Sequence, residues 1–170
     1  MEQQLTRIAV KIGSNVLTRR DGTLDVTRMS ALVDQVAELH KAGVEIILVS
    51  SGAVASGRSE IHPAKKLDSV DQKNCMTVML ENGVIPIVNE NDTISVSELM
   101  FTDNDELSGL IASMMDAQVL IILSNIDGIY NGSPADPASE VIREIEHGKD
   151  LSSYIQTSKS SFERGGMLTK

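Results

Sequence analysis

The sequence predicts an α/β fold built on a mainly parallel sheet. Residues 44–49 and 119–123 are nearly all apolar, as in parallel strands that helices cover on both faces, and the apolar run 84–88 predicts another buried strand. Residues 27–42 follow a helical period, and their place between two strands predicts a right-handed crossover. Polar and small residues gather where these strands end, which is where open α/β sheets bind ligands.

The first half of the chain gives the clearest elements. Residues 5–12 predict a first strand that ends at Gly13. In the helix predicted at 27–42, Asp25 or Thr27 can cap the start and Gly43 the end. One face of this helix carries five apolar residues: Met29, Leu32, Val33, Val36 and Leu39.

The second half is less regular. Residues 58–72 are polar and predict a surface loop, and residues 73–82 predict a short helix. Dense turn signals at 131–137 predict a hairpin or lid, and the alternation at 141–145 fits a short strand. A helix before the strand at 119–123 is indicated by its apolar positions Leu107, Leu110, Ile111, Met114 and Met115.

Composition narrows the classes of function. A length of 170 residues predicts one domain with a sizeable core. The net charge of -9 and an aromatic share of 2% argue against nucleic acid and anionic membranes as partners. The single Cys75, with no apolar leader or run of transmembrane length, predicts a soluble cytoplasmic domain.

The stretch from Asn89 to Ser108 is the strongest candidate for a site. It places six carboxylates from Glu90 to Glu106, after one buried strand and before a helix. Asn and Asp are also common turn formers and helix caps, and Asp103 with Glu106 resembles a capping box. Capping accounts for one or two of these side chains and leaves the others to bind a ligand.

Three further segments are candidate phosphate sites. Lys11 precedes Gly13-Ser14, Ser51-Gly52 follows a strand, and Gly165-Gly166 precedes Lys170. Glycine lets the backbone approach an anion, and lysine supplies positive charge. An edge-strand charge, an ordinary turn and a frayed terminus are the respective alternatives. The pattern Gly-x4-Gly-Lys-[Ser/Thr] is absent, so a P-loop fold is not predicted.

As a set, six motifs in order resemble the amino acid kinase family. They are Val10-Lys11-Ile12-Gly13-Ser14, Val49-Ser50-Ser51-Gly52-Ala53-Val54, Val88-Asn89-Glu90-Asn91-Asp92, Thr102-Asp103-Asn104-Asp105-Glu106-Leu107-Ser108, Asp127-Gly128-Ile129-Tyr130 with Asp136-Pro137, and Gly165-Gly166-Met167-Leu168-Thr169-Lys170. The resemblance implies a three-layer αβα sandwich on a mainly parallel open sheet. It is closest to those members that phosphorylate the side-chain carboxylate of L-glutamate with ATP, the first step of proline biosynthesis.

The resemblance also implies roles for individual residues. Lys11 and Lys170 would supply positive charge to the transferring phosphoryl group, and Asp105 would hold both ammonium groups. Magnesium would be held by ATP oxygens and water, without a protein ligand. Glutamate would be bound by Ser51, Asn89, Asp92, Asp103 and Asn104. ATP would be bound by Lys11, Gly13, Gly52, Ser124, Asn125, Gly165, Gly166, Met167, Thr169 and Lys170.

The chain departs from the family in two places. The family carries a few tens of further residues near 70–74, and it continues beyond the position of Lys170, many members with a PUA domain. Residues 1–170 therefore predict an incomplete amino acid kinase domain. A non-catalytic fragment or pseudoenzyme that binds glutamate or a partner subunit, and a sister kinase with another substrate, stay open. A homo-oligomer and proline as a feedback inhibitor are further expectations from the resemblance.

Overall fold

A four-stranded parallel sheet forms the centre of the computed structural model, which describes residues 5–50, 69–89, 104–146 and 148. The strand order is β3-β2-β1-β4, and every pairing is parallel. The strands are β1 Arg7–Ile12, β2 Glu45–Ser50, β3 Ile87–Val88 and β4 Val119–Leu123. The predicted parallel α/β architecture is confirmed.

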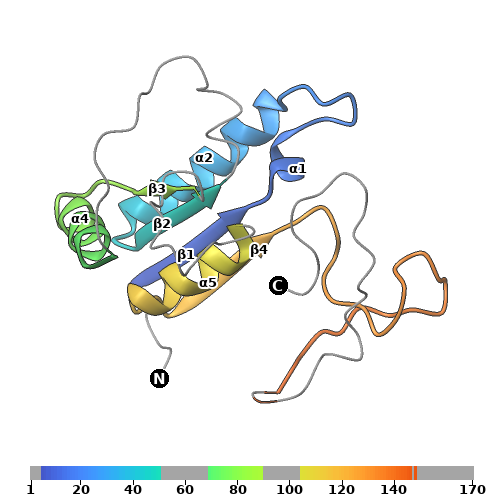
Figure 1. Ribbon diagram of the computed structural model, residues 1–170. Helices are drawn as coiled ribbons and strands as arrows, with labels where there is room; N and C mark the ends of the chain where they lie inside the picture. The colour runs from blue at the N-terminus through green and yellow to red at the C-terminus, as the bar shows by residue number, and fades with distance from the viewer. Residues whose placement is uncertain (1–4, 51–68, 90–103, 147, 149–170) are drawn as a thin grey trace.

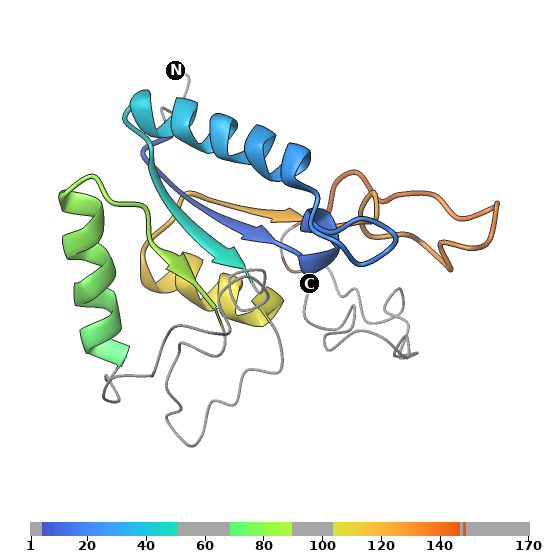
Figure 2. The ribbon, with the colours of Figure 1, turned by 90° about the horizontal axis from the view of Figure 1, so that it is seen from above.

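Helices lie on both sides of this sheet, which gives the three layers (Figures 1 and 2). Helix α2 covers one face, and α5 lies on the opposite face, with α4 beside the β3 edge. A one-turn helix, α1, follows β1. The helix bounds are α1 Ser14–Leu17, α2 Val26–Lys41, α4 Ser69–Glu81 and α5 Asn104–Met114. Because β1, α2 and β2 follow one another in the chain, α2 is the predicted crossover between parallel neighbours.

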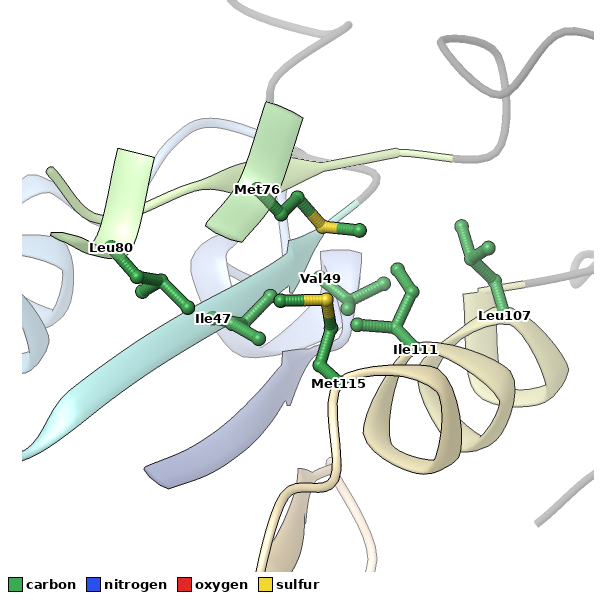
Figure 3. Packing of buried hydrophobic residues seen from close by; sticks show 7 residues of the cluster. All are labelled: Ile47, Val49, Met76, Leu80, Leu107, Ile111 and Met115. Atoms are coloured by element: carbon green, nitrogen blue, oxygen red, sulfur yellow. The ribbon is translucent and has the colours of Figure 1, made fainter. Parts of the chain in front are cut away.

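Two apolar clusters fill the space between the layers. On the α5 face, residues of β2, α4 and α5 meet (Figure 3). This cluster consists of Ile47, Val49, Met76, Leu80, Leu107, Ile111 and Met115. On the α2 face, buried residues of β1 and β2 pack with Leu17 of α1 and with the half-buried Met29, Leu32 and Val36 of α2. The core is aliphatic, as expected from a composition almost free of aromatic residues.

The structure confirms the predicted caps of helix α2 but buries only part of its predicted apolar face. The Asp25 side chain accepts a hydrogen bond from Arg28 N at 3.1 Å, and Gly43 after the helix has φ +88°. Val33 is 64% exposed and Leu39 is 42% exposed, so two of the five apolar residues expected on one face of α2 are in exposed positions. The set of apolar residues by which α2 packs on the sheet is smaller than the set on its apolar face. A helix that lies on a sheet buries only the side that is turned toward the sheet.

Strand β4 was expected to be covered on both faces, and this prediction is wrong. Val119 and Ile121 are more than a third exposed. The register pairs them with Ile8 and Val10, whose side chains lie on the α2 face. Helix α2 contacts the β2 side of the sheet, and no helix among the described residues covers β4 on that face.

Two other predicted strands are shorter than expected. The apolar run 84–88 contributes only two residues to β3, at the edge of the sheet, and Ile87 is 59% exposed. At 141–145 the structure has a single antiparallel bridge, between Tyr130 and Val141, and no strand. The loop at 129–142 is closed by backbone bonds such as Ile142 N to Ile129 O at 2.7 Å, which agrees with the predicted hairpin-like turn.

Candidate active site at the carboxyl end of the sheet

The strand register determines which way Lys11 points. Lys11 pairs with Val49 of β2, and Val49 pairs with Val88 of β3. Paired residues of neighbouring parallel strands lie on the same face, and Val49 belongs to the cluster under α5. The Lys11 side chain therefore projects from the carboxyl end of β1 toward helix α5.

Lys11 meets Asp105 there in a buried ion pair. Lys11 Nζ lies 2.5 Å from Asp105 Oδ1, and the two side chains are only 11% and 7% exposed. Taking two charges out of water is costly, and replacing such a pair by apolar residues is often neutral or stabilising. A pair retained in this position therefore favours a role in binding or chemistry over one in stability.

Helix α5 holds Asp105 at a fixed place. Asp105 and Glu106 occupy its first turn, where negative charge is favoured by the helix dipole. The Ser108 hydroxyl, fully buried, donates to the Asp105 carbonyl oxygen at 2.7 Å. Leu107 and Ile111 anchor the same helix in the core. The carboxylate is thus positioned by packing as well as by its partner.

Gly13 leaves room for the Lys11 ammonium group. Its N–H donates to Leu123 O at 3.2 Å, which ties the end of β1 to the end of β4. A Cβ at Gly13 would lie 3.3 Å from that oxygen and 3.6 Å from Lys11 Nζ. Glycine therefore allows a close approach of the backbone that any other residue would crowd.

A pair of buried asparagines lies beside the ion pair. Asn104 Nδ2 donates to Asn89 Oδ1 at 3.3 Å, and Asn89 is fully buried. The Asn89 Nδ2 atom has no hydrogen-bond partner among the described residues. A buried donor without a partner costs about 1–3 kcal/mol, and a ligand acceptor at this position would offset that cost.

The structure thus brings together part of the predicted site. Lys11, Gly13, Asn89, Asn104 and Asp105 lie at the carboxyl ends of β1 and β3 and at the start of α5. Ser124 and Asn125 follow β4 directly, next to the Gly13–Leu123 contact. The other predicted site residues lie outside the described ones: Ser51, Gly52, Asp92, Asp103, Gly165, Gly166, Met167, Thr169 and Lys170.

Two buried serines at this end were given no role from sequence. Ser108 supports the Asp105 backbone, and a serine three residues after an aspartate in the first turn of a helix could have indicated it. Ser50 is buried at the end of β2. The family resemblance points to its neighbour Ser51, and the strand register was needed to see that Ser50 is the last residue of β2.

The loop after β4 carries one perturbed group. Tyr130 OH donates to Asp127 Oδ2 at 3.3 Å. Burial, followed by the negative charge of Asp127, raises the pKa of Tyr130 above its ordinary value. Tyr130 therefore stays protonated at neutral pH and acts as a donor to Asp127.

The described residues contain neither a cluster of metal-binding side chains nor a helix suited to a membrane. In that part of the chain, no three His, Cys, Asp or Glu side chains gather as metal ligands would. None of its helices combines the length and apolar character that crossing a membrane requires.

Comparison with known proteins decides the family. The sequence model of the Amino acid kinase family matches residues 6–74 and 62–170. This chain belongs to the amino acid kinase family. The solved structure of Giardia carbamate kinase supports the same fold, with a TM-score of 0.52 over 82% of this chain and 80% of that one, at 12% identity.

Three similar proteins within the family are glutamate 5-kinases. Glutamate 5-kinase of Bacteroides thetaiotaomicron is 71% identical over all of this chain and 60% of its own length. Glutamate 5-kinase of Chlorobaculum tepidum is 39% identical (96% of this chain, 58% of its own), and glutamate 5-kinase 2 of Bacillus subtilis is 36% identical (99% and 58%). The chain therefore spans about three fifths of the length of these curated relatives.

The alignment with the Bacteroides protein also contains positions that have no residue in this chain. The comparison with the Bacteroides protein spans 216 positions and includes all 170 residues of this chain, so 46 positions have no residue here. The family is matched in two pieces that overlap at residues 62–74.

Proposed function

We propose that this chain is the catalytic part of a glutamate 5-kinase, which transfers the γ-phosphoryl group of ATP to the side-chain carboxylate of L-glutamate. The observation that carries the proposal is the buried Lys11–Asp105 pair at the carboxyl end of the sheet, beside the Asn89 amide nitrogen, which has no hydrogen-bond partner among the described residues. The names of relatives that match along the whole chain support this substrate. The reaction is the first step of proline biosynthesis.

The chemistry needs fixed positive charge. A carboxylate oxygen of glutamate forms a bond to the γ-phosphorus while the bond to the ADP oxygen breaks, so two anions meet as charge builds up. Catalysis of such a transfer consists mainly of positioning and electrostatic stabilisation. Lys11 supplies one charge and Lys170 the second, and Asp105 orients the ammonium groups. No base is required, because a glutamate carboxylate is already ionised at neutral pH.

The glutamate site is proposed beside this pair. The free donor of Asn89 suits a carboxylate oxygen, and Asn104 holds the Asn89 amide in place. Asp92 would attract the α-ammonium group, since a charged acceptor binds it more strongly than a neutral one. Ser51 and Asp103 complete the proposed set.

The nucleotide is proposed to lie across the ends of β1 and β4. Gly13 and Lys11 there would approach its phosphates, with Ser124 and Asn125 beside them. The other proposed nucleotide residues are Gly52, Gly165, Gly166, Met167, Thr169 and Lys170. The described carboxylate of this site, Asp105, is already bound to Lys11, so Mg²⁺ would be held by ATP oxygens and water. Bound in this way, the ion neutralises phosphate charge.

Further properties are proposed from the relatives. Residues 1–170 would form most of an amino acid kinase domain that lacks a segment near 70–74. We propose that the protein works in the cytoplasm as a homo-oligomer and that proline inhibits it.

A direct assay tests the function. The purified chain is incubated with ATP and Mg²⁺ plus glutamate, aspartate, N-acetylglutamate or carbamate, and the acyl phosphate is trapped with hydroxylamine. Intact mass spectrometry of the same sample verifies the 18.3 kDa chain. The Bacteroides glutamate 5-kinase serves as the positive control. Hydroxamate formed with glutamate alone supports the proposal, whereas turnover of another acceptor, or no turnover in a folded sample, contradicts it.

A further inference from the structure

Ser108 lies one turn along α5 from Asp105 and is fully buried. Residues three apart on a helix lie on the same face, so both residues belong to the buried face of α5. The Ser108 hydroxyl donates a hydrogen bond to the Asp105 carbonyl oxygen at 2.7 Å. This bond restrains the backbone from which the Asp105 carboxylate reaches Lys11.

Strand β1 runs along α5 in the opposite direction. Arg7 Nη1 donates to the carbonyl oxygen of Met115, just after the end of α5, and Lys11 contacts the first turn of the same helix. Ala9 lies between Arg7 and Lys11 on the same face of β1 and is fully buried. Ser108, which is also small, belongs to the part of α5 that faces this strand. Small residues on both elements allow a close approach, which the short aspartate side chain needs to reach Lys11.

The sequence around Ser108 is unfavourable for a helix. Ser108 is followed by Gly109, and both residues have a lower helix propensity than alanine or leucine. A Cβ at Gly109 would meet nothing within 4 Å, so packing does not require glycine there. The first turn of α5 is therefore held less by the intrinsic preference of the chain than by burial and by the Ser108 hydrogen bond.

We propose that Ser108 is a positioning residue, whose hydroxyl holds the first turn of α5 where Asp105 pairs with Lys11. The proposal rests on the function proposed above for this pair in phosphoryl transfer. Without the hydroxyl, the Asp105 backbone gains freedom, and the carboxylate holds the Lys11 ammonium group less steadily. The loss acts on kcat more than on KM, because stabilising the transition state requires a more exact placement of charge than binding the substrates does.

Paired variants separate the hydroxyl group from the size of the side chain. Ser108→Ala removes the hydroxyl and adds no bulk. Ser108→Thr keeps the hydroxyl and adds a methyl group, and Ser108→Val has the same shape as Ser108→Thr without the hydroxyl. Ser113→Ala is the matched control, because Ser113 is an exposed serine of the same helix. Circular dichroism verifies that each variant is folded.

The hydroxamate assay gives kcat and the KM values for ATP and glutamate. Ser108→Ala should lower kcat about tenfold and leave both KM values within about twofold. Ser108→Val should have a kcat about tenfold below that of Ser108→Thr, and Ser113→Ala should match the original chain. Gly109→Ala raises the helix propensity and should reduce the loss that Ser108→Ala causes. Equal kcat values for Ser108→Thr and Ser108→Val, or a rise in KM alone, overturn the proposal.

A second measurement does not depend on turnover. The rate at which N-acetoxysuccinimide acetylates Lys11 is measured by peptide mass spectrometry, with the exposed Lys41 of α2 as the internal reference. Ser108→Ala and Ser108→Val should speed the labelling of Lys11 at least about threefold, because the pair opens more often, whereas Ser108→Thr should not. If the original chain has no turnover but labelling follows this order, the proposed function fails and the positioning role stands. If labelling does not respond to loss of the hydroxyl, the positioning role is wrong even where kcat falls.

Discussion

The two ends of the central sheet each pair a cation of β1 with a carboxylate, but in different surroundings. At the amino end, Arg7 Nε lies 2.7 Å from Glu45 Oε2, with the side chains 27% and 37% exposed. At the carboxyl end, the Lys11–Asp105 pair is nearly excluded from water. Both pairs join elements that are distant in sequence, so the pairs differ in burial and not in sequence separation.

Hydrogen bonding distinguishes the two ends. At the amino end, Arg7 Nη1 donates to Met115 O at 2.5 Å, and Gln118 Oε1 accepts from Thr6 N, Thr6 Oγ1 and Arg7 N. These bonds close the turns around the strand ends. At the carboxyl end, the buried Asn89 donor has no partner among the described residues. At the amino end the polar side chains hydrogen-bond to one another and to the backbone. At the carboxyl end a buried donor could still bind a ligand acceptor.

The largest expected effect is on turnover. Lys11→Met should reduce ATP-dependent hydroxamate formation with glutamate by about a hundredfold or more, because a fixed charge near the reacting group is lost. Arg7→Met, the matched removal of a β1 cation at the other end, should leave kcat within about twofold in folded protein. Equal losses in the two variants would contradict the functional difference between the ends.

A large effect on stability is expected from breaking the buried pair. Asp105→Asn should lower the free energy of unfolding by about 3–5 kcal/mol, since it leaves the Lys11 ammonium buried without its counter-charge. Urea denaturation measures this. The double variant Lys11→Met/Asp105→Leu should be more stable than Asp105→Asn, because it removes both charges. A double variant that is less stable would show that the pair itself holds the fold.

Asn89 should separate binding from stability. Asn89→Leu should weaken glutamate binding about tenfold, or about 1.4 kcal/mol. Its free energy of unfolding should change by less than about 1 kcal/mol, because removing an unpartnered donor offsets the loss of the acceptor for Asn104. Calorimetry with glutamate and urea unfolding measure the two effects. Asn74→Leu, at an exposed position of α4, is the control and should alter neither by more than a few tenths of a kcal/mol.

The amino end should behave in the opposite way. Gln118→Ala removes the acceptor shared by Thr6 and Arg7 and should lower the free energy of unfolding by about 1 kcal/mol. Glutamate affinity should stay unchanged, since the site lies at the other end of β1. A shift in glutamate affinity without loss of stability would place Gln118 in the site and remove the contrast.

The smallest effect concerns an exposed acid. Hydrogen bonds from the Thr23 side chain and then the Thr23 backbone hold the pKa of Asp21 below 3.8. The folded state therefore favours ionised Asp21, so this contribution is present above pH 3.8 and is lost as pH falls through the lowered pKa. NMR titration should show the Asp21 pKa moving up toward 3.8 in Thr23→Ala, because the side-chain hydrogen bond is lost.

Much of the fold follows from local patterns. The apolar runs located β1, β2 and β4, and the helical period located α2 to within a residue or two at each end. Burial was predicted less well: Val33, Leu39, Ile121 and Ile87 are apolar but exposed. Hydrophobic pattern shows which residues can be buried, whereas the neighbouring elements decide which are.

The motifs nominated Lys11, Asn89, Asn104 and Asp105 before any geometry was known. That was possible because polar residues at strand ends and helix starts stand out against an apolar framework. Sequence could not show that Lys11 and Asp105, 94 positions apart, form one buried pair. It also could not show that Ser108 supports Asp105, or that the Asn89 donor lacks a partner within residues 5–50, 69–89 and 104–146.

The sequence by itself determined the class of fold, the order of its elements and the family, because these depend on periodicity and on motifs that are local in the chain. Only the tertiary structure decided which charges are removed from water and which apolar residues remain at an edge. The physical reason is that burial and pairing depend on strand register, and register brings together residues that are distant in sequence.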